Sequence, residues 1–571
     1  MFVRVKKVGP YQYLQIAHNR REGKRVKQSI IATLGRLDKL TASGAIDQLL
    51  RSAARFAERL MVLAEHSFDA HDAPDTQVVS IGPALIFERL WRETGCQAVV
   101  RKLLGTRHHH FDVERAVFMT VLHRLFVSGS DRSALRWRRD QAIDATEGLE
   151  LQHLYRAMGW LGEALDEPEP DAPSPRRTKD LIEEALFARR RDLFTDLDLV
   201  FFDTTSVFFT GEGGETLGQY GKSKDRRSDC KQMVLGMVID GDGIPVCSEM
   251  WPGNTADVTT LDRVAERLQR RFGVRRVCLV ADAGMISKKM IAAVEARGWL
   301  YILGARLRRT TEVRDVVLSD TGAFETVEVE RQRPDPMELQ VKEVTLCDTP
   351  CNGAENEPRK PRRYVVCRNP DQARKDAATR AQILAALENK LRSDGPKSVV
   401  ANKGYKRYLK AEKDAFVVDF DKARDEQRFD GMWVLRTNTE LSAVEIALRY
   451  KQLWMVEQVF RTAKSLLDTR PIFHKTDATI CGHVFCSFLA LVLRDELFRR
   501  MDNAGVSAEW DDILRDLNAL SETTITYNGK SFAVRSNAVG VAGKIAQCVG
   551  VRLPHTVRQI DVETERAEPS H

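Results

Sequence analysis

The stretch FFDTTSVFF, from Phe201 to Phe209, combines β-branched and aromatic residues around a single carboxylate. This composition is typical of a buried strand. Burying an ionised carboxylate costs free energy unless a counter-charge compensates it, and a divalent cation supplies such a charge. Asp203 is therefore either a metal ligand or a strand residue whose carboxylate bonds to the backbone or to Thr204.

Further apolar segments on the C-terminal side of this strand predict a mixed α/β sheet. Two strand-like segments follow it, KQMVLGMVID and IPVCSEMW, and helical and strand-like patterns then alternate from Thr259 to Leu307. Three meandering strands followed by this alternation describe a sheet with helices available for its faces. Asp282 ends one of the apolar strands, CLVADAG, at the position where α/β proteins place functional groups.

A third carboxylate lies in a helical segment, YKQLWMVEQVFRTAK, from Tyr450 to Lys464. Tyr450, Glu457 and Lys464 are seven residues apart, so they drift by only about 20° per heptad and share one stripe of a regular helix. Apolar residues form the neighbouring stripe, which can pack on the sheet. Glu457 is thus placed to complete a metal site, and the alternative is a solvated polar face.

The residue types fit one kind of chemistry. Mg²⁺ and Mn²⁺ prefer hard oxygen ligands such as carboxylates. A pair of these ions can activate a water or a 3′ hydroxyl and stabilise the leaving oxygen when a phosphodiester bond is displaced. Three carboxylates can hold two ions and leave coordination positions open for the substrate.

Together these motifs resemble the DDE transposases of bacterial insertion sequences, in the group with a Tyr, Arg, Glu, Lys signature on the last catalytic helix. Tyr450, Glu457 and Lys464 match the spacing Y-x2-R-x3-E-x6-K, with Leu453 at the position of the signature Arg. The segments YGKSKDRRSDCKQMVLG and PGNTAD echo the family's stretch between the first two acids. The resemblance covers about Leu199 to Leu493 well and the basic N-terminus more loosely.

The resemblance implies catalysis by Asp203, Asp282 and Glu457 with two Mg²⁺ or Mn²⁺ ions. It implies a ribonuclease H-like mixed sheet flanked by helices and interrupted by a largely β insertion. It further implies double-stranded DNA as partner, with recognition of terminal inverted repeats, synapsis by a homodimer and strand transfer into target DNA. A structure-specific nuclease of the same fold, and a catalytically silent DNA-binding descendant of a transposase, are the alternatives.

The signature helix carries further DNA contacts under this resemblance. Tyr450 and Lys464 are expected to contact phosphates, and Trp454 can stack on a displaced base. Leucine cannot bind phosphate, so we expect Leu453 to pack against the core. Arg461, one turn beyond Glu457, is expected to supply the missing phosphate contact.

The N-terminal stretch alternates apolar and polar residues around turn signals, which predicts a small antiparallel sheet. Met1 to Leu40 holds ten Lys or Arg against two acidic residues, a net charge of +8 that exceeds the +7 of the whole chain. Such a segment is suited to a polyanion, although a solvated basic face gives the same count. The residues expected to bind DNA are Arg4, Lys6, Lys7, Arg20, Arg21, Lys24, Arg25 and Lys27.

Six regions are expected along the chain. They are a basic β segment (1–40), a helical end-recognition region (41–165), a catalytic domain in two parts (178–307 and 430–500), an insertion (308–429) and a C-terminal region that contributes to dimerisation (501–571). The Pro-rich acidic stretch DEPEPDAPSP, residues 166–175, is expected to be a linker or exposed loop.

Three features predict a cytoplasmic protein, and the resemblance implies a bacterial one that is associated with the nucleoid when bound to DNA. The start MFVRVKKVGP lacks the apolar segment of a secretory signal. The longest apolar run, VFCSFLALVL from Val484, is too short to span a bilayer and predicts a buried helix. Ten cysteines scattered singly fit reduced thiols, not a disulfide framework.

Overall fold

The computed structural model describes residues 2–22, 25–42, 45–46, 75–105, 107–165, 175–190, 199–274, 277–329, 337–346, 361–393, 403–412, 415–467, 469–527 and 530–560. The chain divides into two compact units, which are described separately. The first comprises Met1–Ser80, Arg515–Gly543 and Arg552–His571, and the second comprises Ile81–Leu514 and Lys544–Val551. Most of the predicted linker, residues 166–174, lies outside the described residues.

The N-terminal sheet of the first unit confirms the period-two prediction. Strands β1 (Phe2–Val8), β2 (Tyr11–Glu22) and β3 (Arg25–Arg36) form an antiparallel sheet in the order β1-β2-β3. Gly9 takes φ +58° in the tight turn between β1 and β2, a conformation that glycine adopts without steric cost. The short helix α1 (Leu37–Ala42) follows β3 and packs on β2 and β3.

A second sheet of this unit was not predicted. Strand β4 (Asp75–Ser80) pairs with β16 (Ser521–Tyr527), and the sheet continues through β17 (Lys530–Arg535) to β18 (Val557–Ile560). The prediction of a helical region from residue 41 to 165 is therefore wrong for residues 75–80. The partner of β4 lies more than 400 residues further along the chain, so no local pattern indicated the pairing.

Helices dominate the start of the second unit, as predicted. Its core is the long helix α18 (Asp477–Asn503), against which α6 and α8 pack. By length and composition α18 is apolar enough to cross a membrane, but 83% of its most apolar window is buried inside the protein. The predicted buried helix is thus confirmed. The other helices are α4 (Gly82–Glu93), α5 (Cys96–Leu104), α6 (Val113–Phe126), α7 (Asp131–Arg138), α8 (Leu151–Leu161) and α9 (Thr178–Arg190).

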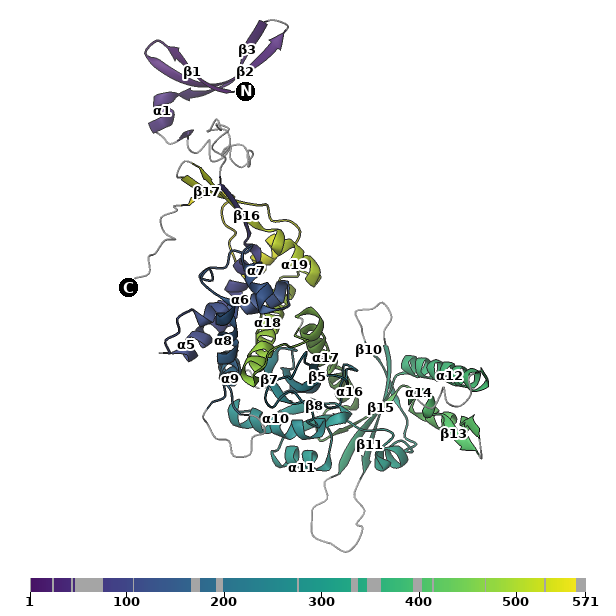
Figure 1. Cartoon of the computed structure of the whole chain (residues 1–571). Helices are drawn as coiled ribbons and strands as arrows, with labels where there is room; N and C mark the ends of the chain where they lie inside the picture. The colour runs from purple at the N-terminus through teal and green to yellow at the C-terminus, as the bar shows by residue number, and fades with distance from the viewer. Residues whose placement is uncertain are drawn as a thin grey trace. The chain divides into compact units, whose positions relative to one another are not determined.

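A nine-stranded sheet forms the centre of the second unit (Figure 1). Its first part has the order β7-β6-β5-β8-β9, in which β5, β6 and β7 are antiparallel and β8 and β9 run parallel to β5. This is the ribonuclease H-like arrangement that the sequence predicted. The strands are β5 (Leu199–Phe208), β6 (Gln232–Asp240), β7 (Pro245–Pro252), β8 (Cys278–Ala281) and β9 (Leu300–Gly304).

One face of this sheet is covered by α10 (Asp257–Arg271) and α11 (Lys288–Ala296), whose apolar side chains form one core with it. Val200 and Phe202 of β5 and Leu279 and Ala281 of β8 belong to that core. Because side chains alternate between the two faces of a strand, their sequence neighbours point to the opposite face.

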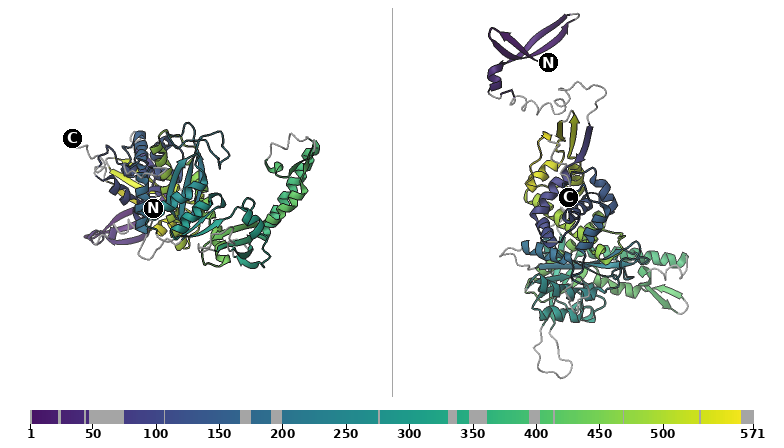
Figure 2. Two further views of the ribbon diagram at one scale, coloured as in Figure 1. Left: turned by 90° about the horizontal axis from the view of Figure 1, so that it is seen from below. Right: turned by 60° about the vertical axis from the view of Figure 1, so that its left-hand side comes forward.

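The strands of the insertion extend the same sheet. Strand β15 (Met432–Thr437) pairs antiparallel with β9, and beyond it lie β12 (Arg362–Arg368), β11 (Met337–Leu346) and β10 (Glu325–Val329). The 24-residue helix α12 (Pro370–Ser393) extends away from this end of the sheet (Figure 2). The remaining elements here are α14 (Lys403–Lys406), β13 (Leu409–Glu412), β14 (Ala415–Val418), α15 (Phe420–Asp425) and the short turns η2 (Glu312–Val317) and η3 (Glu426–Phe429).

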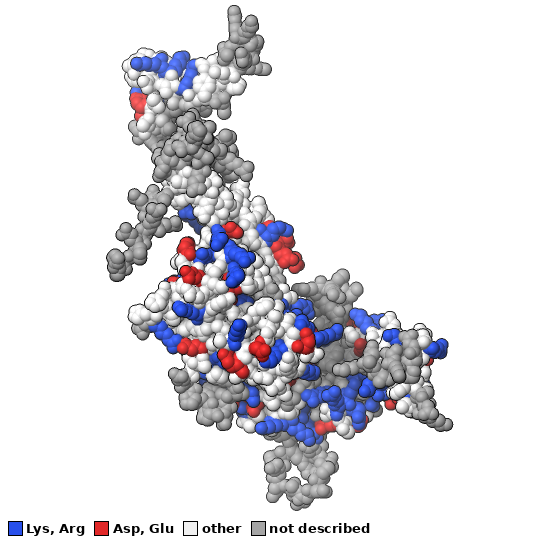
Figure 3. All heavy atoms as spheres, viewed as in Figure 1, with Lys and Arg blue, Asp and Glu red and all other residues white. Residues whose placement is uncertain are grey.

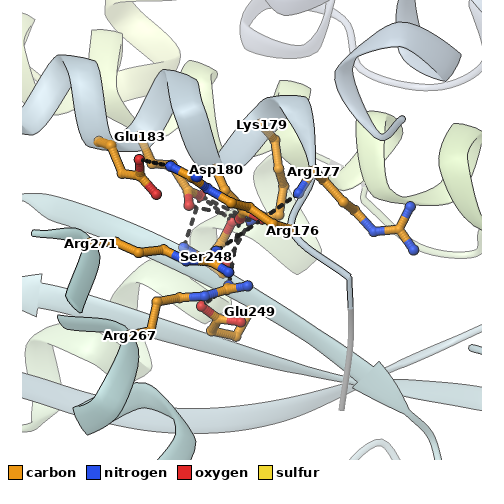
Figure 4. A network of polar contacts seen from close by, with 10 residues as sticks. Arg176, Arg177, Lys179, Asp180, Glu183, Ser248, Glu249, Arg267 and Arg271 are labelled. Atoms are coloured by element: carbon orange, nitrogen blue, oxygen red, sulfur yellow. Dashed lines mark hydrogen bonds and ion pairs between the residues drawn. The ribbon is translucent and has the colours of Figure 1, made fainter. Parts of the chain in front are cut away.

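A buried ionic network fixes α9 to the edge of the sheet (Figure 4). Lys179 Nζ lies 2.6 Å from Asp180 Oδ1 and donates to the carbonyl of Ser248 on β7 at 2.7 Å. Glu183 accepts hydrogen bonds from both the amide and the hydroxyl of Ser248, at 2.9 and 2.6 Å. Arg267 of α10 pairs with Glu249. The network joins the helical region to the large sheet through charged side chains that are largely buried.

Candidate active site

Asp203, in the middle of β5, and Asp282, directly after the end of β8, lie on neighbouring parallel strands. Phe202 of β5 is paired with Ala281 of β8, so each aspartate is the next residue along its own strand. Asp282 continues the extended backbone, with φ −76° and ψ 160°. Since Phe202 and Ala281 point into the core under α10 and α11, both carboxylates point to the other face. The sequence prediction of two strand-borne acids in one sheet is confirmed.

The environment of Asp203 disfavours its charge. Burial raises the pKa of its carboxyl to about 6, and the nearby carboxylates of Asp282 and Asp257 act in the same direction. The amide of Thr204, which donates to Asp203 Oδ1 at 2.7 Å, and the ammonium of Lys224, at 4.0 Å, oppose this effect. The alternative expectation for Asp203, a carboxylate bonded to the backbone at Thr204, matches this contact.

Lys224 and Asp257 join this group from segments to which the sequence analysis assigned no role. Lys224 Nζ donates to the carbonyl and hydroxyl oxygens of Thr204, at 2.6 and 2.8 Å, and lies 3.7 Å from Asp257 Oδ2. The hydroxyl of Thr204 donates in turn to Asp257 Oδ1 at 2.8 Å. The two residues come from YGKSKDRRSD and PGNTAD, and the resemblance of these segments to the family is the signal that could have identified them.

Tyr450 lies on α16 (Ala443–Lys451) and reaches the second aspartate. Its hydroxyl donates a hydrogen bond to Asp282 Oδ1 at 3.0 Å. A Cβ at residue 304 would lie 2.3 Å from that hydroxyl, so Gly304 leaves the room that the tyrosine needs. Burial and the adjacent Asp282 raise the pKa of the Tyr450 hydroxyl, which keeps it protonated as a donor. Arg306 binds the carbonyl oxygens of Ala283 and Gly284, at 2.9 and 2.8 Å, and holds the loop after Asp282.

The signature segment is not one regular helix, which corrects the prediction. Helix α16 ends at Lys451, and α17 (Trp454–Arg461) begins after a turn with 3₁₀-type hydrogen bonds from Leu453 to Tyr450 and from Val456 to Leu453, both 3.1 Å long. A π-helical turn, η4 (Thr462–Leu466), follows α17. Since these turns have more or fewer residues than an α-helical turn, the single stripe of Tyr450, Glu457 and Lys464 does not follow from the seven-residue spacing.

Glu457 is exposed on α17, and α17 packs on β5 through its buried residues Val456, Val459 and Phe460. The helices α16 and α17 thus lie on the face to which both aspartates point. Within the part of the chain that the structure describes, no three acidic, His or Cys side chains converge closely enough to hold a metal ion. The structure brings Asp203 and Asp282 together and leaves the Glu457 side chain open to solvent.

The other residues of the signature segment have different environments. Lys464 Nζ donates to Asp225 Oδ1 at 2.8 Å, and Arg470 lies 2.7 Å from the other oxygen of that carboxylate. Trp454 is 57% exposed and Arg461 is also exposed, so both are accessible to a ligand. Leu453 is only 8% exposed, which confirms that it packs against the core.

The predicted basic residues of the N-terminal sheet lie on all three strands. Arg4 is half-buried on β1, where Lys6 and Lys7 are exposed. The backbone positions of Arg20 and Arg21 lie on β2, and those of Arg25 and Lys27 lie on β3. Lys24 lies outside the described residues. In Figure 3, Lys and Arg also gather over the end of the large sheet that carries β11 and β15.

Two family models match the chain. Residues 3–66 match the N-terminal domain of the IS1634 family transposases, and residues 195–493 match the transposase DDE domain. No curated protein matches. A solved structure, the piggyBac transposase in a cryo-EM synaptic complex with hairpin DNA, is similar at TM-score 0.37 and 13% identity, over 76% of this chain and 79% of that chain. Because the DDE domain model spans more than half of the 571 residues, the chain belongs to the DDE transposases and is a DNA transposase, an enzyme that cuts DNA and transfers strands.

Proposed function

We propose that this transposase cuts the ends of its own element and joins them to target DNA with Asp203, Asp282 and Glu457 as the catalytic acids. The observation that supports this assignment is that Asp203 and Asp282 each directly follow the paired residues Phe202 and Ala281 of adjacent parallel strands, and lie on the face covered by α16 and α17. The matching family domain works with divalent metal ions. We assign two Mg²⁺ or Mn²⁺ ions to these acids.

The donor set fits such ions. Two carboxylates share one face, a third at Asp257 raises the pKa of Asp203 further, and Lys224 supplies only one positive charge among them. Hard carboxylate oxygens with uncompensated charge are what Mg²⁺ and Mn²⁺ bind. When bound, two ions activate the attacking water or 3′ hydroxyl and stabilise the leaving oxygen.

Glu457 completes this set through repositioning of its side chain. Glu457 is exposed on α17, a helix that already packs on β5, so a change of its side-chain orientation would let it hold a metal ion together with Asp203 and Asp282. Tyr450 meanwhile holds Asp282 in one orientation, and Lys224 holds the backbone of β5 at Thr204.

The exposure and charge of residues outside the three acids indicate further contacts with DNA. Trp454 and Arg461 are accessible for a displaced base and a phosphate. Lys464 is paired with Asp225, so it binds a phosphate only by exchanging that partner. We assign binding of the terminal inverted repeats to the basic N-terminal segment. We further propose synapsis by a homodimer, and action in the bacterial cytoplasm on nucleoid DNA.

The test is to incubate the full-length protein and Mg²⁺ with the DNA that flanks its own coding sequence. We expect cleavage at both boundaries, and joining of a pre-cut 3′ hydroxyl end to a supercoiled target plasmid. EDTA should abolish both products. Cleavage without joining would support a ribonuclease H-like nuclease, and binding without either product would support a silent DNA-binding protein. Each of these two results would overturn the proposal.

A further inference from the structure

One face of the N-terminal sheet carries a connected row of polar side chains, which we call the polar face. Its members are Arg4 on β1, Gln15 and Asn19 on β2, and Gln28 and Thr33 on β3. Residues paired across neighbouring strands share a face. Arg4 is paired with Gln15, Gln15 with Thr33, and Asn19 with Gln28, so all five lie on the same side.

Hydrogen bonds link these side chains across all three strands. Arg4 donates to Gln15 Oε1 through Nε and Nη2, at 3.2 and 3.1 Å, and Gln15 Nε2 donates to Thr33 Oγ1 at 3.1 Å. Gln28 Nε2 donates to Asn19 Oδ1 at 3.2 Å, and Arg4 also donates to Gln28 Oε1. Ala17 shares this face and is completely buried, so its small side chain lets Arg4 and Gln28 close over it. The network fixes the side chains before any ligand arrives.

The fixed groups keep hydrogen-bonding capacity for a ligand. Asn19, Gln28 and Thr33 are exposed, and an amide that accepts one hydrogen bond still has its own N–H donors. Arginine recognises guanine, and asparagine or glutamine recognises adenine, by paired hydrogen bonds in the major groove. Side chains that are already ordered lose little entropy on binding.

The spacing of the polar face matches that of stacked bases. Same-face residues on a strand are separated by about 6.8 Å, twice the rise per residue of roughly 3.4 Å. Successive bases on one DNA strand are about 3.4 Å apart, so neighbouring same-face residues span two base-pair steps. The major groove is about 12 Å wide and admits a β ribbon. The net charge of +8 over Met1 to Leu40 suits the surrounding phosphates.

The opposite face of the sheet combines valines on β1 with polar residues such as His18 and Ser29, which are not part of the network described above. Val3 and Val5 occupy it on β1, and they are 60% and 51% exposed. Valine side chains have no hydrogen-bonding groups with which to tell one base pair from another. Gln12, which pairs with Lys7, lies on this valine face and is exposed.

We propose that the polar face reads base edges in the major groove of duplex DNA, with Arg4, Asn19 and Gln28 as the residues that determine sequence preference. This inference rests on the proposed function, in which DNA is the substrate. The exposed Lys6, which pairs with Tyr13 and so lies on the polar face, then positions the sheet by a contact to a phosphate, which carries no sequence information.

The experiment selects DNA from a pool of duplexes with a randomised centre, using the full-length protein. We expect the wild type to enrich one motif. In Asn19→Ala and Gln28→Ala, preference at one or two base pairs should fall by roughly 5- to 150-fold, the size of one lost paired contact. The salt dependence of binding should stay unchanged, because neither variant removes a charge. Lys6→Ala should instead weaken binding to all sequences and reduce the slope of log K against log salt by about 0.9.

Gln12→Ala is the matched control, because it removes the same kind of side chain as Gln28→Ala from the valine face. It should enrich the wild-type motif. Thermal melts followed by circular dichroism verify that the variants fold. The inference is overturned if the wild type enriches no motif, if the two polar-face variants keep the wild-type motif, or if Gln12→Ala changes it. If the wild-type protein enriches a motif but neither cleaves nor joins DNA, the proposed function is overturned and the inference about the polar face stands.

Discussion

The hydroxyl of Tyr450 donates a hydrogen bond to the carboxylate of Asp282, across 168 residues of sequence. The family resemblance predicts that this tyrosine contacts a phosphate, and in the structure its hydroxyl is bonded to an acid of the candidate site. A hydrogen bond to a charged group contributes about 1.5–3 kcal/mol. We therefore assign Tyr450 the role of orienting the carboxylate of Asp282.

Tyr450→Phe tests this role because it removes only the hydroxyl. We expect single-turnover cleavage to slow by roughly 10- to 100-fold, from the lost orientation of Asp282. The affinity for end DNA, measured by fluorescence anisotropy, should not change. A weaker affinity with an unchanged cleavage rate would instead indicate a phosphate contact.

Asp203→Ala, Asp282→Ala and Glu457→Ala should each abolish cleavage while binding of end DNA stays largely intact, because the acids serve the chemistry and the basic segment serves affinity. Gel-based cleavage assays and binding titrations on the same preparations separate the two effects. Asp502→Ala, which removes an exposed carboxylate of α18, is the control. Cleavage at the wild-type rate would remove the substituted acid from the site.

Arg461→Ala should depress cleavage about as much as Lys464→Ala, because we assign Arg461 the phosphate contact that the signature Arg makes in the family. Arg461 is exposed, whereas Lys464 must first release Asp225. The comparison needs cleavage rates at several salt concentrations, since a lost phosphate contact also flattens the salt dependence. Equal rates for Arg461→Ala and the wild type would show that this contact is missing.

Leu453→Arg tests the same assignment by restoring an arginine at the position of the signature Arg. Leu453 is 8% exposed in the turn between α16 and α17, so an arginine there should destabilise the protein or be neutral, and it should not enhance cleavage. Urea unfolding and cleavage assays give the two readouts. Faster cleavage with unchanged stability would mean that residue 453 is an open phosphate site, and that the assignment of Arg461 is wrong.

The sequence predicted the parts of the site that depend on local patterns. Asp203 and Asp282 were found because each interrupts or ends an apolar strand, and strand alternation then places both on one face. The turn at Leu453 was missed because the residues from Tyr450 to Lys464 are compatible with a continuous helix. Lys224 was missed because a lysine in a loop is usually solvated, and only the fold brings it to Thr204. The pairing of β4 with β16 depends on contacts too distant in sequence to leave a local pattern.

Lys179→Met should destabilise the protein by about 3–5 kcal/mol, because it removes the cation that pairs with the buried Glu183 and the closest of the three cations that pair with Asp180. Urea unfolding at neutral pH measures the loss. Lys231→Met removes an exposed pair with Glu212 and should leave the free energy of unfolding unchanged. Similar stabilities of the two variants would show that the network in Figure 4 adds no net stability.

Acid should destabilise the second unit through three buried histidines. Burial, with the positive charge of Arg124, lowers the pKa of His123 and of His474 to about 4 and lowers that of His483 well below its usual value. Arg124 Nη2 lies 2.7 Å from His483 Nδ1, and the arginine must donate, so this nitrogen is unprotonated. His483 Nε2 then carries the hydrogen and donates to the carbonyl of Thr469 at 3.3 Å. A second proton on His483 would face the guanidinium directly.

The direction of the pH effect follows from these pKa values. The unfolded chain binds a proton at each histidine near pH 6.5, whereas the folded protein does so only near pH 4 or below. The unfolded state therefore holds more protons in this window, and stability falls as the pH is lowered, by up to about 1.4 kcal/mol per pH unit for each histidine.

His483→Gln should be less stable than the wild type at pH 8 but lose less stability between pH 6.5 and pH 5. His108→Gln, at an exposed position, should follow the wild-type curve. Parallel pH curves for His483→Gln and the wild type would show that His483 titrates alike in the folded and unfolded protein, and the acid lability would then have to come from other groups.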